Sequence, residues 1–379
     1  MSTTLDTTGT APETTGRPHW IDDWEPEDPA FWAAGGADGA CRNLIFSILS
    51  EHIGFSIWTM WSVLVLFLGP KYGFQPEDKF LLTIVPALVG SVLRLPYTFA
   101  VATFGGRNWT VFSALLLVLP TVATLLVLEP GVSLNTLLLV SALAGVGGGN
   151  FASSMSNINA PYPQHLKGRA LGLNAGGGNL GVAAVQLAGL LVLATAGKTH
   201  PRDLIAAYLT FIGPLVGSII RPFGGLLADR FGGARVTFVN FVAMAATAAT
   251  VLSASLQKSL PLFLIGFCAL FVFSGIGNGS TYKMIPAIFR AKSQLLVDAG
   301  AEPAVSDRDA RRLSGALIGI AGAIGAFGGV LVNVAFRQSF LDTKRGNAAY
   351  VAFLAFYAVC FVLTWVVYLR LSARRLAGV

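Results

Sequence analysis

Ten long apolar runs occupy most of this chain and restrict what it can fold into. A bilayer core about 30 Å thick needs about 20 apolar residues per helix, and each run reaches that length. In lipid every backbone polar group must find its partner inside the chain, so such runs predict helices. The runs lie near residues 43–68, 80–104, 109–128, 134–158, 169–196, 205–228, 234–256, 260–289, 314–340 and 348–371. We therefore expect an all-α polytopic membrane protein with about ten transmembrane helices.

Composition agrees with a membrane protein and argues against an enzyme. Charged residues make up 12% of the chain, about half the share of about 25% in soluble domains. The patterns GxSxG, HExxH and GxxxxGK are absent. Cys41, Cys268 and Cys360 lie far apart and form no CxxC pair, so neither a disulfide nor a zinc site is predicted. We expect no enzymatic activity and no cofactor.

The distribution of basic residues predicts the orientation of the helices. With ten spans and both ends on one side, the segments on that side hold 15 Lys and Arg residues, and the loops on the other side hold 8. Basic residues favour the cytoplasmic side. We therefore expect the plasma (inner) membrane, with both termini in the cytoplasm. The sequence pI of about 9.5 then requires no nucleic acid as a partner.

An internal repeat divides the chain into two halves. GSVLRLPYTFAVATFGGRNWT at 90–110 matches GSIIRPFGGLLADRFGGARVT at 217–237, with an offset of 127 residues. Arg94 matches Arg221, and a glycine-rich basic turn follows in both copies. Two homologous halves that pack around a shared centre are typical of transporters. The repeat predicts that the two arginines occupy equivalent positions.

Several segments resemble known transporter motifs. GGLLADRFGGARV at 224–236 resembles the loop motif of the major facilitator superfamily. GGGNFASSMSNINAPYPQHLKGRALGLNAGGGNLGVAAVQL at 147–187, GALIGIAGAIGAFGGVL at 315–331 and NLIFSILSEHIGFSIWTMWSVL at 43–64 resemble helices of the nitrate/nitrite porter family within it. The resemblance covers nearly all of residues 43–371, and it implies a transporter fold that normally has twelve helices.

Compared with that family, the sixth and seventh helices are expected to be absent. In the second half only a polar stretch separates the glycine-rich helix ending near Ala196 from the arginine-bearing run. The predicted organisation is an acidic cytoplasmic tail (1–42), an N-terminal bundle of helices 1–5 (43–196), a short outer junction (197–204), a C-terminal bundle equivalent to helices 8–12 (205–371) and a basic tail (372–379).

Three cations fall inside apolar runs, where a charge costs roughly 2.5–3.5 kcal/mol and marks a functional site. They are Arg94, Arg221 and Lys283, and Glu51 is the one acidic residue clearly inside a span. Guanidinium presents forked donors that suit a planar oxyanion. The two arginines, lacking obvious internal counter-ions, are expected to bind the substrate anion. Lys283, six residues from a helix end, fits either the site or an interface position.

The resemblance adds further site residues. It implies that Arg94 and Arg221 bind nitrate or nitrite, that Asn179 contacts the anion and that Phe151 packs against it. Asn174, on the same glycine-rich span, is a candidate donor, and helix–helix hydrogen bonding is the alternative for both amides. In the family the aromatic residue opposite Phe151 lies on the seventh helix, so this chain is expected to lack it, together with a tyrosine near the substrate.

Exchange of nitrate for nitrite is the favoured mechanism, because a positive, empty site is costly to reorient. Glu51 with His52 is a weak candidate pair for proton coupling. The alternatives are a porter for another small anion, distinguished by Lys283, and a non-transporting remnant or anion sensor. A homo-oligomer in the lipid bilayer is a further possibility, because two missing helices would leave apolar faces without neighbours.

Overall fold

The computed structural model describes residues 24–196, 212–343 and 345–371, and the regular structure within these ranges is helical. Nine stretches of these residues are long and apolar enough to cross a membrane, and α10 covers the predicted run at 205–228 from Ile212 onward. The helices are α1 (Pro29–Phe31), η1 (Trp32–Gly36), α2 (Ala37–Phe67), η2 (Pro70–Tyr72), α3 (Pro76–Phe104), α4 (Gly106–Leu116), α5 (Val118–Val127), α6 (Leu134–Ala144), α7 (Val146–Asn159), α8 (Gln164–Ala196), α10 (Ile212–Phe231), α11 (Gly233–Gln257), α12 (Leu260–Asp298), α13 (Pro303–Thr343), α14 (Asn347–Thr364) and η3 (Trp365–Leu371). The predicted all-α polytopic fold is confirmed.

The glycine turn of the internal repeat has the same backbone conformation in both copies. Gly105, between α3 and α4, has φ 82° and ψ 145°, and Gly232, between α10 and α11, has φ 87° and ψ 137°. Residues with a side chain rarely adopt such positive φ values. The two copies of the repeat, 127 residues apart in the sequence, therefore also share the same local backbone structure at this turn.

Two predicted spans consist of two helices each. The first changes direction at Leu117, whose N–H bonds to the Ala114 carbonyl at 3.2 Å, and the second at Gly145, whose N–H bonds to the Ala142 carbonyl at 3.0 Å. Hydrogen bonds between residues three apart, instead of four, tighten the helix locally. At Gly145 a Cβ atom would lie 2.6 Å from the Val89 side chain, so the glycine permits α6 and α7 to approach α3.

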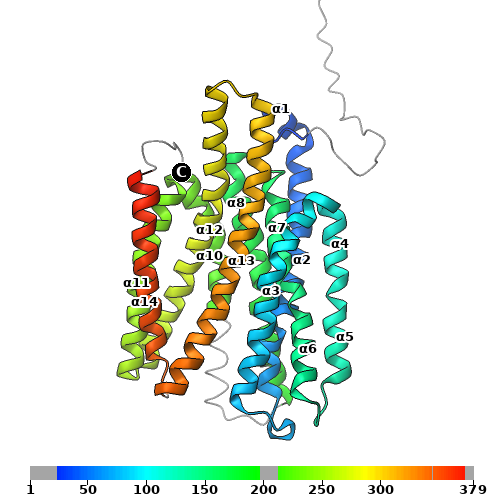
Figure 1. The fold of residues 1–379 in the computed structure, drawn as a ribbon, viewed down its shortest axis with the longest axis vertical. Helices are drawn as coiled ribbons and strands as arrows, with labels where there is room; N and C mark the ends of the chain where they lie inside the picture. Colours follow the sequence, from blue (N-terminus) through cyan, green and yellow to red (C-terminus); the bar gives the residue numbers. More distant parts are fainter. Residues whose placement is uncertain (1–23, 197–211, 344, 372–379) are drawn as a thin grey trace, which may run out of the picture.

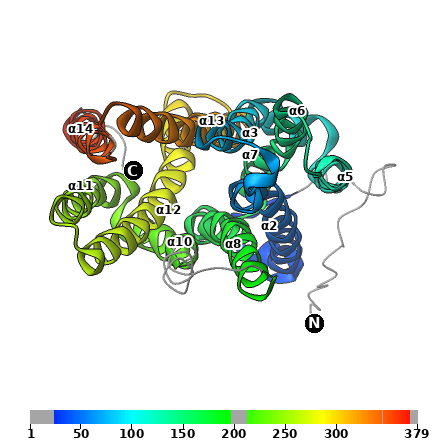
Figure 2. The same ribbon diagram turned by 90° about the horizontal axis from the view of Figure 1, so that it is seen from below.

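The two halves of the chain meet along two pairs of helices. Figure 2 shows α8 beside α10 and α3 beside α13, and both pairs are in extensive contact. We call the end that carries α1 and the turn between α12 and α13 the upper end, as it is drawn in Figure 1, and the end that carries η2 the lower end. The arginine-bearing helices α3 and α10 thus each lie at a junction between the halves.

The described residues before the first predicted span form helices and contacts of their own. Asp28 accepts hydrogen bonds from the N–H groups of Ala30 and Phe31, which starts α1. Trp24 Nε1 donates to the Pro161 carbonyl at 3.0 Å, so this segment is fastened to the connection between α7 and α8. Helix α2 begins at Ala37, before the predicted bound of the bundle at residue 43. Residues 1–23, the predicted junction at 197–204 and the predicted tail at 372–379 lie outside the described residues.

Candidate functional site

Arg94 lies in the centre of the molecule and joins the two halves. It is 6% exposed, and its guanidinium donates to the Gly148 carbonyl on α7 at 3.0 Å and to the Gly322 carbonyl on α13 at 2.6 Å. The guanidinium carbon also lies 4.5 Å from the ring centre of Phe151 and 5.3 Å from that of Trp58. Backbone carbonyls and aromatic faces thus offset part of the cost of burying this charge.

Arg221 makes the corresponding contact from the other half. Its side chain, on α10, donates to the Ala175 carbonyl on α8 at 2.9 Å. Its Nε atom is buried and has no hydrogen-bond partner among the residues that the structure describes. Each arginine therefore donates to a backbone carbonyl of the opposite half, and Arg221 keeps a free N–H that an anion can accept.

Glu51 supplies a buried carboxylate within electrostatic range of both arginines, although it forms no ion pair with either of them in the part of the chain that the structure describes. Glu51 is 0% exposed and interacts electrostatically with Arg94 and Arg221. Its Oε2 atom accepts hydrogen bonds from Ser154 Oγ and, at 2.8 Å, from Asn174 Nδ2. Among the described residues, the Oε1 atom has no hydrogen-bond partner.

Asn174, predicted as either a substrate donor or a helix–helix contact, bonds to buried side chains in this structure. Its amide nitrogen is occupied by Glu51 and, at 2.8 Å, by Ser154 Oγ, and the side chain is 0% exposed. The structure therefore makes Asn174 a partner of the buried carboxylate. Asn179 lies five residues further along α8 and donates to Ser218 Oγ on α10 at 3.2 Å, across the junction of the halves.

Tyr282 is a central residue that the sequence did not single out. It is 7% exposed and packs edge-on against Phe151, with 5.4 Å between the ring centres, and it interacts electrostatically with both arginines. Tyr282 thus supplies an aromatic ring beside Phe151 from α12, whereas the aromatic residue expected from the family lies on the seventh helix. A signal was present, because Tyr282 lies in GIGNGSTYKM at 275–284, the repeat of the segment that contains Phe151.

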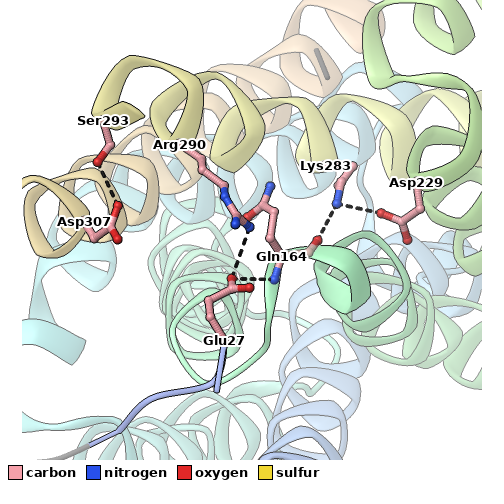
Figure 3. Close-up of polar contacts among 7 residues, drawn as sticks. All are labelled: Glu27, Gln164, Asp229, Lys283, Arg290, Ser293 and Asp307. Carbon is pink, nitrogen blue, oxygen red and sulfur yellow. Dashed lines mark hydrogen bonds and ion pairs between the residues drawn. The ribbon is translucent and has the colours of Figure 1, made fainter. Parts of the chain in front are cut away.

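Lys283 follows Tyr282 on α12, and its side chain extends from the central group toward the start of α8 at the upper end. Its Nζ atom is 2.7 Å from Asp229 Oδ1 on α10 and donates to the Gln164 carbonyl at the start of α8 at 2.6 Å (Figure 3). The sequence placed Asp229 in a turn, whereas it belongs to helix α10. Because the Lys283 ammonium is already engaged by Asp229 and Gln164, these contacts do not favour Lys283 as a substrate ligand. They instead join the two halves near the upper end.

The open space is unequal at the two ends. A cavity of about 650 Å³ at the lower end is lined by Trp58, Ser62, Lys79, Thr83 and Asn333, among others. Trp58 also lies beside Arg94, with 5.3 Å between its ring centre and the guanidinium carbon. At the upper end a cavity of about 60 Å³ lies beside Glu27, Gln164 and Arg290. The larger of these two cavities is therefore at the lower end.

Sequence comparison places the chain among known transporters. It is 32% identical to the nitrate/nitrite transporter NarU of Salmonella typhimurium, over 92% of this chain and 96% of the relative. It is 33% identical to NarU of Escherichia coli, with the same coverage of both proteins. The chain belongs to the nitrate/nitrite transporter family. A Thermus thermophilus protein named "Probable nitrate/nitrite antiporter NarK2" is 28% identical over 94% of this chain and 98% of the relative. No protein-family model matches.

Solved structures show the same fold in this member of the nitrate/nitrite transporter family. The xylose transporter XylE from E. coli, in a partially occluded inward-open conformation, superposes with a TM-score of 0.62, at 12% identity, over 87% of this chain and 98% of that chain. A second structure of XylE, a proton:xylose symporter of the major facilitator superfamily, gives a TM-score of 0.63 at 11% identity, over 88% and 96% of the two chains. At such identities the likeness concerns the fold, which is that of the superfamily. The chain is a multi-pass membrane protein and not an enzyme.

The alignments also show that the relatives are longer within the matched region. The match to the Salmonella protein extends over 444 positions, although this chain has 379 residues. Because 92% of 379 is about 349, about 95 aligned positions have no residue in this chain. Two membrane helices of about 20 residues each, with their loops, fit within that length.

Proposed function

We propose that this chain is a nitrate/nitrite transporter that exchanges the two anions by alternating access, with the substrate held between Arg94 and Arg221. The observation that carries the proposal is the central group itself, in which two arginines from equivalent helices flank the aromatic pair Phe151 and Tyr282. The names of the NarU relatives supply the substrates, and the name of the Thermus relative supplies exchange.

The chemistry of the group fits a small planar anion. The free Nε–H of Arg221 is a donor for one oxygen, and the rings of Phe151 and Tyr282 offer apolar faces for a flat ion. Asn179, at the α8–α10 junction, is the further proposed contact, while Asn174 holds Glu51 in place. Of the predicted site residues, Lys283 is proposed to act in closing the upper end.

Charge balance favours exchange over movement of an empty site. Binding of one nitrate or nitrite lowers the net charge of the site by one, from +2 to +1 with Glu51 protonated and from +1 to 0 with Glu51 ionised. Reorienting a buried net charge in the bilayer is expensive, so the loaded state is the one that crosses.

The sidedness follows from the basic residues. Arg42, Arg107, Arg169, Arg290 and Arg311 belong to segments at the upper end, which we therefore assign to the cytoplasm of a plasma (inner) membrane. On this assignment the cavity of about 650 Å³ faces outward, and the structure represents the outward-facing state. Lys79 is then a positive charge in the outer entrance.

The missing helix pair is part of the proposal. The alignment gap of about 95 positions supports the loss of the sixth and seventh helices, as the internal repeat predicts. The α8–α10 and α3–α13 junctions are nevertheless complete. The gap also favours the second candidate, a non-transporting remnant or anion sensor, and it leaves room for a homo-oligomer whose second copy covers the exposed faces.

The test is uptake of ¹⁵N-nitrate into proteoliposomes that are preloaded with nitrite. The intact chain is compared with Arg94→Ala and Arg221→Ala, after size-exclusion chromatography shows each to be folded and monodisperse. We expect exchange by the intact chain and its loss in both variants. Folded protein that binds nitrate without exchange would indicate the sensor, and preferred exchange of another anion would indicate a different substrate. Cross-linking in native membranes reports the oligomeric state.

A further inference from the structure

A second group of charged residues surrounds the small cavity at the upper end. Three cations from three helices line it, Lys167 of α8, Arg290 of α12 and Arg311 of α13, together with the carboxylates of Glu27 and Asp307. Asp307 already accepts a hydrogen bond from Ser293 Oγ at 2.8 Å (Figure 3). The volume of about 60 Å³ has room for a few waters at roughly 10–15 Å³ each, and hence for a small anion.

Lys167 is the unusual member of this group. Its side chain is only 5% exposed, and it forms no hydrogen bond or ion pair with any residue that the structure describes. The nearby carboxylate of Glu27 favours its positive charge, whereas the nearby cations Arg311, Lys283 and Arg290 oppose it. Lys167 lines the cavity, and an ammonium group with little water and no ion-pair partner is stabilised by an anion beside it.

Glu27 already places a carboxylate in this cavity. Its Oε1 atom accepts from the backbone N–H of Gln164, the first residue of α8, at 2.8 Å and from Arg290 at 3.3 Å (Figure 3). Unpaired N–H groups at a helix start favour an anion. A carboxylate and a nitrite ion both present two oxygens in one plane. The Glu27 and Arg290 side chains are 48% and 55% exposed, so their pair is weak and displaceable.

We propose that the upper-end cavity is a second binding site for a small monovalent planar oxyanion, and that Glu27 is its tethered competitor. Lys167, Arg290, Arg311 and the Gln164 N–H are the groups that bind the anion. An anion that displaces Glu27 also breaks the contact between the N-terminal segment and α12. On the proposed function, on which the identity of the ligand rests, this ion is nitrate or nitrite on the cytoplasmic side.

The binding test removes the central site first. Full-length Arg94→Ala/Arg221→Ala protein in nanodiscs is dialysed against ¹⁵N-nitrate, and bound ion is counted by mass spectrometry. We expect one remaining site, which Glu27→Gln makes about fivefold tighter, as loss of a weak ion pair implies. Glu25→Gln, an exposed neighbour, is the matched control and should change nothing. Lys167→Gln should abolish the remaining site, whereas the exposed Lys292→Gln should not.

The outcomes separate this inference from the proposed function. No remaining site, or equal affinities in Glu27→Gln and Glu25→Gln, would overturn the inference even if the intact chain exchanges nitrate. A remaining site that responds to Glu27→Gln would support it even if the intact chain does not transport. Competition by nitrite and acetate but not by chloride supports a planar oxyanion, and equal competition by chloride overturns that class. Should Lys167→Gln not fold, Arg311→Gln, exposed in the structure, replaces it.

Discussion

Lys283 Nζ lies 2.7 Å from Asp229 Oδ1, and the two side chains are only 9% and 16% exposed. Asp229 Oδ1 has no well-aligned hydrogen bond, so the contact is primarily an ion pair. The pair joins α10 to α12 within the second half, and the Lys283 bond to the Gln164 carbonyl extends it to the first half. The most buried ion pair of the described residues therefore holds the upper end closed.

Breaking this pair is expected to destabilise the protein. Lys283→Met leaves Asp229 as an unpaired, largely buried charge, at a cost of about 3–5 kcal/mol in the free energy of unfolding. The double variant Lys283→Met/Asp229→Leu should recover most of that loss, because no lone charge remains. Thermal unfolding in detergent measures both. A Lys283→Met protein with unchanged stability but weakened nitrate binding would instead indicate that Lys283 binds the substrate.

Lysine should not replace arginine in the central site. Arg94→Lys keeps the charge but loses the forked donors that reach the Gly148 and Gly322 carbonyls together. Truncation of one partner of a buried, hydrogen-bonded charge costs about 3 kcal/mol, which corresponds to about 100-fold or more. We expect nitrate exchange to fall by that factor. The exposed Arg107→Lys serves as the matched control in the same uptake measurement and should remain active.

Phe151 is expected to matter through its ring face. Phe151→Leu keeps an apolar side chain but removes the ring that lies 4.5 Å from the Arg94 guanidinium, a contact worth about 2 kcal/mol when shielded from water. The half-saturation concentration for nitrate should rise by about 30-fold. Tyr282→Phe, which keeps the edge-on packing, should change it less. Equal effects of both substitutions in the uptake assay would contradict this role of the ring.

Glu51→Gln should bind nitrate more tightly and exchange it more slowly. The substitution removes a carboxylate that can ionise within electrostatic range of Arg94 and Arg221, so the site can no longer lose positive charge through it and release of the anion becomes more costly. We expect about a tenfold fall in both the half-saturation concentration and the maximal rate. Uptake kinetics with and without a protonophore measure them. Exchange that stops in the intact chain when the protonophore is added would instead show proton coupling through Glu51.

Close helix packing at the junction should be sensitive to a single methyl group. At Gly176 on α8 a Cβ atom would lie 2.6 Å from the Ser218 carbonyl oxygen on α10, so Gly176→Ala forces these helices apart, at about 1–3 kcal/mol. Gly325→Ala on α13, where a Cβ meets nothing within 4 Å, is the control. Thermal unfolding should separate the two variants, and equal midpoints would show that the junction adapts.

The sequence by itself determined the elements and their equivalence. Apolar runs predict membrane spans because lipid offers the backbone no hydrogen-bond partners. The repeat predicts that Arg94 and Arg221 occupy matching positions. The similar backbone angles of Gly105 and Gly232 agree with that match. The kinks near Leu117 and Gly145 and the early start at Ala37 were not predicted, because packing between helices decides them.

Only the tertiary structure decided which residues meet. The Glu51 carboxylate, Tyr282 and the arginines lie on α2, α12, α3 and α10, and the distance between such residues along the chain carries no information about their separation in space. The sequence also left two roles open for Lys283, the substrate site or an interface position. Only the structure shows that its ammonium pairs with Asp229 near the upper end. Periodicity is a local property of the chain, whereas the partner of a buried charge is set by how the helices pack.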